Sequence, residues 1–293
     1  MLTRRAAGLS LACALAAILS SCGGPTATPA APPSSTTTTQ TSSSTTSAAP
    51  TTSPTTTIAP TTTPPPTTTT TVPAAPAASG KVVVLDPGHN GGNAAHPGVI
   101  NQLVPAGRGR MKPCNTTGTA TGSGYPEHEF TWDLALRVRE ALAARGVTVV
   151  LTRPDDKGVG PCVDKRADTG NNSGAAAVVS LHADGSTAAG AHGFHIAYSA
   201  PPLNAAQGEP SLRLARTVRD TLVSAGFATS TYIGAQGLSA RDDLGGLNLS
   251  TRPTVLVECG NMREAAEAAV LSSPAGRQRY AEAIANGILG YLG

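Results

Sequence analysis

The sequence has few aromatic residues and little net charge. Phe, Trp and Tyr together make up 3% of its 293 residues, and the formal net charge at pH 7 is only +3. Proteins that bind nucleic acid need a concentrated basic surface, and those that bind single strands also use aromatic side chains on which bases stack. Neither feature is visible here, so we expect no nucleic-acid partner.

Two common catalytic motifs are also absent. The sequence contains no G-x-S-x-G, the turn that presents the nucleophile of many serine hydrolases, and no phosphate-binding loop of the form G-x-x-x-x-G-K-[ST]. No internal repeat is visible either. The chemistry of the protein must therefore be sought in other combinations of residues.

No apolar run is long enough to cross a bilayer, which takes about 20 residues. The N-terminus has two arginines and then a short apolar run over residues 6–19, a pattern typical of a secretory signal. The run ends in LSSC, which resembles a bacterial lipobox. We expect cleavage of residues 1–21 and lipidation of Cys22, with this lipid anchor as the only membrane contact. The alternative is an ordinary secretory signal that happens to contain a cysteine.

Residues 22–79 are almost entirely Thr, Ser, Pro and Ala, with no charge and no apolar pattern. Such a segment cannot bury enough apolar surface to offset its conformational entropy. We expect a disordered Thr/Ser/Pro-rich linker that acts as an extended stalk. The remaining residues, 80–293, suffice for one domain with a sizeable core.

Three cysteines remain in this exported domain, where disulfides can form. They are Cys114, Cys162 and Cys259, which allow three single pairings. Cys114 and Cys162 both lie in loops flanked by proline or glycine, whereas Cys259 follows an apolar strand. We therefore expect a Cys114–Cys162 disulfide, which would contribute about 4 kcal/mol in the chain-entropy model.

Apolar strands alternate with helices along residues 80–293. Helix 126–146, for example, repeats Phe130, Leu134, Val138 and Leu142 on one face. This alternation predicts a single α/β domain with a mainly parallel twisted sheet and helices on both faces. We predict strands at 82–86, 147–152, 176–181, 193–199 (nearer an edge) and 254–258, and helices at 126–146, 163–172, 211–224 and 275–292.

Three of the buried strands end with an ionisable residue at a glycine-containing turn. The endings are LDPGH at His89, SLHADG at His182 and VECGN at Glu258. Strand ends of one sheet can converge on a single crevice. Histidines and carboxylates are also the ligands of catalytic zinc, which uses three protein ligands and keeps one position open.

A third ligand could come from YPEHEF, which offers Glu127, His128 and Glu129 at the start of the first long helix. A carboxylate there is also favoured by the helix dipole, so for either glutamate taken alone an ordinary helix-start charge is the favoured interpretation. Of the remaining histidines, His192 and His195 are interpreted as structural or exposed, and the role of His96, which lies in a loop, stays open.

Taken together and in this order, LDPGHNGG, EHEFTWDLALRV, VSLHADG and VLVECGNM resemble the zinc-dependent N-acetylmuramoyl-L-alanine amidases of the amidase-3 type. The resemblance covers residues 81–293, and its motifs are specific in combination although each is weak alone. GYPEHEF and GPCVDKRA look like the actinobacterial periplasmic members of that family.

The resemblance implies that 80–293 is a zinc amidase domain in which His89, Glu127 and His182 hold zinc and Glu258 is the catalytic acid/base. The substrate would be peptidoglycan or soluble muropeptides, cleaved between N-acetylmuramic acid and L-alanine. We expect a monomer in the cell envelope or periplasmic space, anchored by lipid. The residues support the same chemistry, because a carboxylate beside a metal can take a proton from water and hand it to the leaving amine.

Other interpretations stay open at this point. One is a Cys–His hydrolase that uses Cys259 or Cys162, and another is a catalytically inactive wall-binding or regulatory module with the same fold. Cys259 could be a small buried hydrophobe or a thiol next to the metal. The basic residues of loop 90–124, which are Arg108, Arg110 and Lys112, could cover the metal, contact an anionic muropeptide or form a solvated surface.

Overall fold

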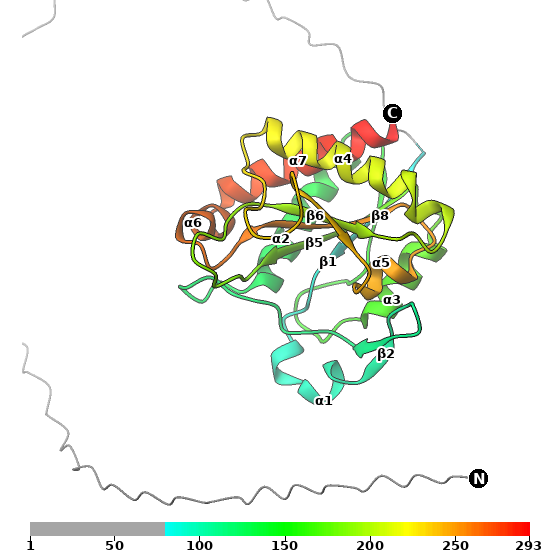
Figure 1. Ribbon diagram of the computed structural model, residues 1–293, viewed down its shortest axis with the longest axis horizontal. Coiled ribbons are helices and arrows are strands. Elements are labelled where there is room, and N and C mark those ends of the chain that lie inside the picture. The colour runs from blue at the N-terminus through cyan, green and yellow to red at the C-terminus, as the bar shows by residue number, and fades with distance from the viewer. Residues whose placement is uncertain (1–79) are drawn as a thin grey trace, which may run out of the picture. The chain divides into compact units, whose positions relative to one another are not determined.

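The computed structural model describes residues 80–293 (Figure 1). The predicted signal peptide, the lipidation of Cys22 and the predicted stalk all lie outside the described residues and stay predictions. No helix within residues 80–293 has the length and apolar character needed to cross a membrane.

Eight strands and nine helical segments follow one another in residues 80–293. The strands are β1 (Val82–Pro87), β2 (Leu103–Pro105), β3 (Met111–Pro113), β4 (Thr148–Leu151), β5 (Ala177–Asp184), β6 (His195–Ser199), β7 (Leu238–Arg241) and β8 (Thr254–Asn261). The helices are η1 (Asn93–Ala95), α1 (Pro97–Ile100), α2 (Glu127–Ala143), α3 (Val163–Asn172), η2 (Ala205–Gln207), α4 (Glu209–Ser224), α5 (Gly245–Leu249), α6 (Ala265–Ser272) and α7 (Pro274–Leu292).

Six of the strands form one sheet in the order β4-β1-β5-β8-β6-β7. All neighbours in it are parallel except β6 and β8, which are antiparallel. β2 and β3 form a separate antiparallel hairpin. The prediction of a single α/β domain with a mainly parallel sheet and helices on both faces is therefore confirmed.

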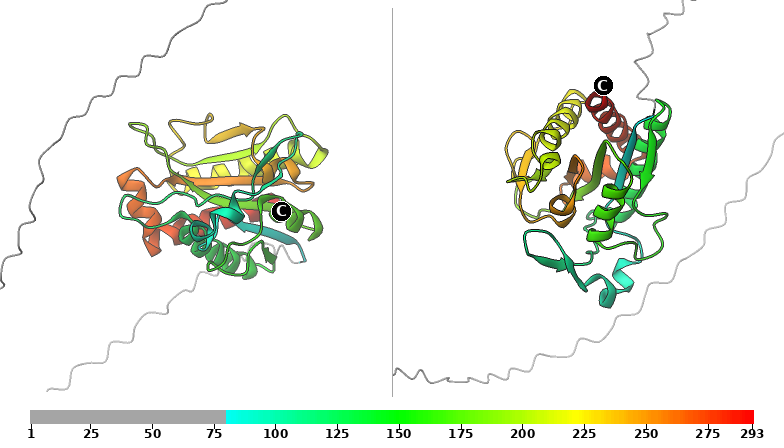
Figure 2. Two further views of the ribbon diagram at one scale, coloured as in Figure 1. Left: turned by 90° about the horizontal axis from the view of Figure 1, so that it is seen from below. Right: turned by 90° about the vertical axis from the view of Figure 1, so that its right-hand side faces the viewer.

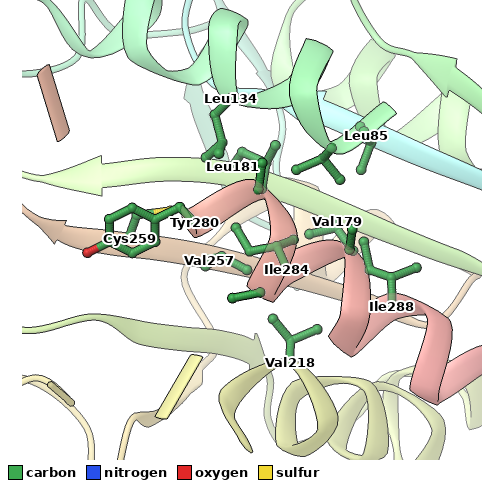
Figure 3. Close-up of a cluster of buried hydrophobic side chains, with 14 of the residues drawn as sticks. Leu85, Leu134, Val179, Leu181, Val218, Val257, Cys259, Tyr280, Ile284 and Ile288 are labelled. Carbon is green, nitrogen blue, oxygen red and sulfur yellow. The ribbon is translucent and has the colours of Figure 1, made fainter. Parts of the chain in front are cut away.

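One face of the sheet carries the hydrophobic core. Val179 and Leu181 on β5, and Val257 on β8, pack against the long helices α2, α4 and α7 (Figure 3). The apolar side chains of α2 recur every four residues, as predicted, and all are buried on this side. Figures 1 and 2 show α4 and α7 on one side of the sheet and the segment with α1, β2 and β3 on the other.

The opposite face of the same strands is more polar. Side chains alternate between the two faces of a strand, so Ser180 and His182 on β5 and Glu258 on β8 turn away from the core and line a pocket of about 510 Å³. Helices α3 and α5 cover part of this face, and both contribute residues to the pocket wall. The pocket is where the predicted site residues gather.

The structure corrects several predicted boundaries. Strands β5 and β8 each continue three residues beyond their predicted ends, so His182 and Glu258 lie within strands. Strand β7 was missed, because LSAR is only four residues long and lies at the sheet edge. Residues 90–125, predicted as one irregular connection, contain α1 and the β2–β3 hairpin. Pro126 is the N-cap of α2 and lies just before its first turn.

Candidate metal centre

Two site residues are direct neighbours across the sheet. His182 on β5 pairs with Glu258 on β8, and Glu258 pairs in turn with His195 on β6. Residues that pair directly on adjacent strands project to the same face. His182, Glu258 and His195 therefore form one row of ionisable side chains across three strands, on the face that contains the pocket.

His89 reaches this row from a tight turn that follows β1. Its backbone is in the left-handed region, with φ of 59°, which non-glycine residues adopt rarely. The preceding Gly88 donates its N–H to the carbonyl of Leu181 (3.0 Å), and its own carbonyl accepts from Thr131 Oγ1 (2.8 Å). Only glycine fits at position 88, because a Cβ there would overlap the ring of His182.

Glu127 enters the site from the first turn of α2 and is only 4% exposed. Its Oε2 accepts the backbone N–H of Thr119 (2.9 Å), and its Oε1 accepts that of Ala183 (3.2 Å). A carboxylate that merely balanced the helix dipole would not need to be buried among these donors. Of the three candidates in YPEHEF, the structure thus brings Glu127 to the histidines.

Glu127 Oε1 lies 3.1 Å from His89 Nε2 and 3.0 Å from His182 Nδ1. One ligand atom from each of the three residues lies within 4.8 Å of the other two. Donors at 2.0–2.1 Å from a tetrahedral zinc are separated by about 3.3 Å. Both the spacing and the His–Glu–His donor set thus fit a zinc ion.

The electrostatics of the cluster favour a charged carboxylate between the two rings. Burial alone would raise the pKa of Glu127, but His89 and His182 more than offset this and hold it well below its usual range. For His89, burial lowers the pKa, and the nearby Glu127 carboxylate outweighs that effect and raises it. A negative charge held at the histidines is the environment that a divalent cation requires.

Glu258 has the opposite electrostatic environment. Burial raises its pKa well above the usual value, and the charges of Glu127 and Asp184 raise it further. Its Oε2 is buried and has no hydrogen-bond partner among residues 80–293. The surroundings thus lower the pKa of Glu127 and raise that of Glu258. With this arrangement one carboxylate can bind a cation while the other exchanges protons.

The sequence is similar to that of known enzymes. The family model for N-acetylmuramoyl-L-alanine amidase matches residues 83–290. The N-acetylmuramoyl-L-alanine amidase Rv3717 of Mycobacterium tuberculosis is 52% identical over 214 residues, which cover 73% of this chain and 87% of that protein. The chain belongs to this amidase family. It is therefore a hydrolase that acts on an amide bond of cell-wall peptidoglycan, at an extracellular or cell-envelope location.

Solved structures of amidases share the fold. The apo form of the N-acetylmuramyl-L-alanine amidase Ami1 from Mycobacterium abscessus is 54% identical, with a TM-score of 0.71 and coverage of 73% of this chain and 100% of that one. The N-acetylmuramoyl-L-alanine amidase AmiC2 of Nostoc punctiforme is 27% identical, with a TM-score of 0.55 and coverage of 73% and 98%.

The three cysteines within residues 80–293 of this amidase are accounted for without a catalytic thiol. Cys114 and Cys162 form the predicted disulfide. Cys259 is fully buried in the core, on the face of β8 opposite to Glu258. The interpretation of Cys259 as a small hydrophobe is confirmed, and the suggestions of a thiol ligand or a Cys–His hydrolase are wrong.

The basic residues of loop 90–124 are paired with the protein itself. Arg110 Nη2 lies 2.8 Å from Asp242 Oδ2, and Lys112 Nζ lies 3.6 Å from Asp243 Oδ2. Arg108 donates from Nε to Asn248 Oδ1 (3.0 Å). The β2–β3 hairpin is thereby fixed to the β7–α5 region, and Lys112 lines the pocket. Arg110 and Lys112 nevertheless keep much of their side chains in solvent, so a solvated basic surface and a contact with the muropeptide both stay open.

The other candidates of the sequence lie apart from the cluster. His128 pairs with Asp156 (Nδ1 to Oδ2, 2.7 Å), and Glu129 is exposed. His96 Nδ1 lies 2.8 Å from the carbonyl of Gly92, and His192 is exposed. The exposed position of His192 agrees with the prediction of a structural or exposed histidine.

His195, which was predicted to be structural or exposed, is buried: it is 2% exposed and lies directly beside Glu258. Burial lowers its pKa to about 4, which keeps the ring neutral near pH 7. Its neighbour Tyr232 donates from Oη to Asp184 Oδ2 (2.9 Å). Sequence patterns gave no signal for this group, because the register that aligns β6 with β8 is set by tertiary packing.

Proposed function

We propose that the protein hydrolyses the amide bond between N-acetylmuramic acid and L-alanine with the help of a zinc ion. His89, Glu127 and His182 hold the ion, and Glu258 is the general acid/base. The observation that carries this proposal is the His–Glu–His cluster, with a buried Glu127 between two half-buried histidines and Glu258 next to it, on the wall of the pocket. Family membership supports the choice of substrate.

Zinc supplies Lewis acidity, which polarises an amide carbonyl and makes a water molecule more acidic. The protein contributes the arrangement of the donors. Two backbone N–H groups hold the Glu127 carboxylate, which lies between the two imidazoles. His182 and Ala183 lie on β5 and Glu127 lies in the first turn of α2, so this part of the site sits on rigid elements.

Glu258 transfers protons in this mechanism. It accepts a proton from the attacking water and later delivers it to the nitrogen of the departing L-alanine. The pKa of its carboxyl group is raised well above the usual value, which suits a group that must take up and release a proton near neutral pH. Its position within β8 fixes the carboxyl group relative to His182 on the adjacent strand.

The pocket supplies the binding surface. Its volume of about 510 Å³ lies within the range of about 300–1,000 Å³ that is usual for small-molecule sites. Val178 and Leu256 form an apolar part of the wall, while Ser180 and Lys112 offer polar groups. Such a wall suits a peptide that combines small aliphatic side chains with amide and carboxyl groups.

We also propose, from the N-terminal sequence, how this enzyme is held in the envelope. A signal peptide over 1–21, a lipid at Cys22 and a stalk over 22–79 would tether the catalytic domain, residues 80–293, to the outer side of the membrane. The domain would act as a monomer.

The test uses the purified full chain with muramyl dipeptide as substrate. We expect release of N-acetylmuramic acid and a dipeptide with a free alanine amine, loss of the reaction with a chelator, and its return with one equivalent of zinc. Retention of full activity in thoroughly chelated protein would contradict the metal assignment. Zinc binding without cleavage of muramyl dipeptide or of polymeric peptidoglycan would contradict the catalytic one.

A further inference from the structure

A buried arginine on a neighbouring helix donates hydrogen bonds to the turn that carries His89. Arg166 on α3 is 4% exposed and donates from Nη2 to the backbone carbonyl of His89 (2.7 Å). Its Nη1 donates to the carbonyl of Pro87 (2.7 Å) and to Asp86 Oδ1 (2.8 Å). One guanidinium therefore binds three successive parts of the segment that ends in His89.

A second contact holds the imidazole ring of His89. Its Nδ1 lies 3.1 Å from the carbonyl oxygen of Thr116, which also accepts from Asn93 Nδ2 (2.7 Å). A carbonyl can only accept, so this contact favours the tautomer with the proton on Nδ1. Nε2, which faces Glu127, is then the unprotonated nitrogen that a metal needs.

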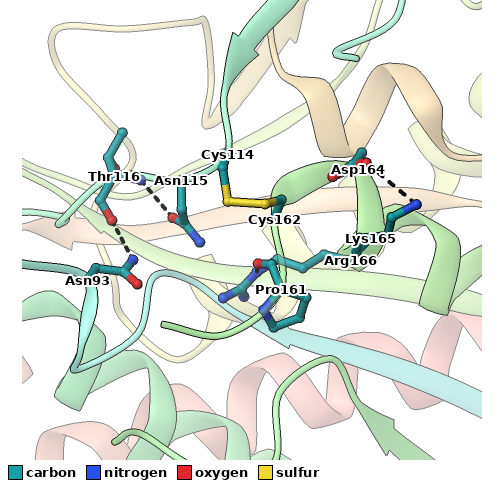
Figure 4. Close-up of a disulfide and its surroundings, with 9 residues drawn as sticks. All are labelled: Asn93, Cys114, Asn115, Thr116, Pro161, Cys162, Asp164, Lys165 and Arg166. Carbon is teal, nitrogen blue, oxygen red and sulfur yellow. Dashed lines mark hydrogen bonds and ion pairs between the residues drawn. A yellow bond between two sulfur atoms is a disulfide. The ribbon is translucent and has the colours of Figure 1, made fainter. Parts of the chain in front are cut away.

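The disulfide joins the two segments that make these contacts (Figure 4). Cys114 precedes Thr116 by two residues, and Cys162 precedes Arg166 by four, within the first turn of α3. Cys162 also accepts the backbone N–H of Arg166 (3.0 Å), and Val163 donates to the carbonyl of Cys114 (2.9 Å). We call the disulfide together with Arg166 and Thr116 the His89 bracket.

The backbone of His89 explains why such a bracket is needed. Its φ of 59° lies in a region that L-residues avoid, so the turn does not hold this conformation by itself. Strain of this kind persists only where the surroundings impose it. Arg166 binds the carbonyl of the strained residue, and Thr116 binds its ring.

We propose that the Cys114–Cys162 disulfide, through Arg166 and Thr116, positions His89 for metal binding. This inference rests on the metal ligands assigned under the proposed function. Arg166 and Thr116 are positioning residues, since neither is a ligand. Removal of comparable outer contacts at metal sites lowers metal affinity by about 10–100-fold.

The test measures the dissociation constant of zinc for the full chain by competition with a chromophoric chelator. We expect Arg166→Gln to bind zinc about 10–100-fold more weakly than the native protein, and Arg166→Lys to recover part of the loss. Arg252→Gln is the matched control, because Arg252 also donates to a backbone carbonyl of α3, that of Asn171, at the opposite end of the helix. We expect its zinc affinity to change by less than about threefold.

The disulfide is tested with Cys114→Ser/Cys162→Ser, which we expect to weaken zinc binding by about tenfold. This variant also serves if Arg166→Gln does not fold, and thermal unfolding of each metal-free variant shows how much is folded. The absorption spectrum of bound Co²⁺ gives a second readout, because a misplaced imidazole changes the ligand field. We expect altered spectra for the bracket variants and a native spectrum for Arg252→Gln.

Equal zinc affinity in the native protein and the folded bracket variants would overturn the inference and leave the proposed function standing. An equal loss in Arg166→Gln and Arg252→Gln would also overturn it, since the effect would then be general destabilisation. If the native protein itself binds no zinc, the ligand assignment fails and the inference fails with it.

Discussion

The two faces of the central sheet are built from the same strands but have opposite chemistry. On β5, Val179 and Leu181 enter the core, while Ser180 and His182 line the pocket. On β8, Val257 enters the core and Glu258 faces the pocket. Packing on the apolar face fixes the positions of the strands. The ionisable groups on the polar face are therefore held in fixed positions, where their partners can offset the cost of removing them from water.

The largest effect is expected on the polar face, at Glu258. Glu258→Gln should lower kcat by about 10²–10⁴-fold, because the proton transfer is lost. Its thermal unfolding midpoint should stay equal or rise, since a carboxyl group that burial disfavours is replaced by a neutral amide. Steady-state kinetics and calorimetry check the two parts, with Glu129→Gln, an exposed carboxylate, as the control. A variant with native kcat would remove Glu258 from the mechanism.

A substitution on the apolar face should lower the stability of the protein and leave kcat nearly unchanged. Leu181→Ala removes a fully buried side chain of the core and should lower the free energy of unfolding by about 2–5 kcal/mol. At temperatures where the variant is folded, kcat should stay within about threefold of native, because the neighbouring His182 faces the other side. Denaturant unfolding and kinetics on one sample decide this. A kcat loss like that of Glu258→Gln would show that the faces are not separable.

Asp86, on strand β1, makes a pH-dependent contribution to the stability of the protein. Burial raises the pKa of this carboxyl, but Arg166 and hydrogen bonds from Thr152 and Ser180 lower it from 3.8 to about 2. Because the pKa is lower in the folded state, Asp86 stabilises the protein above pH 3.8 and loses this contribution as the pH falls through about 2. The contribution is about 2 kcal/mol.

Asp86→Asn should therefore be less stable than the native protein at pH 7 and should lose less stability between pH 4 and pH 2. Free energies of unfolding measured at several pH values give both quantities. Parallel stability–pH curves for the two proteins would show that Asp86 is not the group responsible.

The smallest effect is expected at Cys259. Cys259→Ala removes one buried sulfur from the core and should cost about 1 kcal/mol of unfolding free energy. Zinc content and kcat should stay native, since this side chain faces away from Glu258. Loss of zinc in the folded variant would restore the idea of a thiol ligand.

Much of the fold could be predicted, because apolar strands alternate with helices that repeat every four residues. His182 and Glu258 were predicted to end their strands, yet both strands continue beyond them. Apolar patterning marks only the part of a strand buried on both faces, and beyond it the strands continue with polar residues that alternate with buried ones such as Ala183 and Cys259. The position of Cys259 follows from alternation alone, since it adjoins Glu258 in a strand.

The remaining features depend on register and on loop structure. The alignment of His195 with Glu258 requires the antiparallel pairing of β6 with β8, and no local pattern specifies it. The hydrogen bond from Arg166 to the backbone carbonyl of His89 joins residues that are 77 positions apart in the sequence. In sequence, Arg166 is simply an arginine on a short polar helix.

The central claim is that the His–Glu–His cluster on the polar face holds zinc. It is tested most directly by the zinc content of three full-length proteins: native, Glu127→Gln and Glu129→Gln. The two glutamates lie two residues apart on α2, one in the cluster and one exposed. We predict one zinc per chain in the native protein and in Glu129→Gln, and almost none in Glu127→Gln. Full zinc content in folded Glu127→Gln would contradict the account.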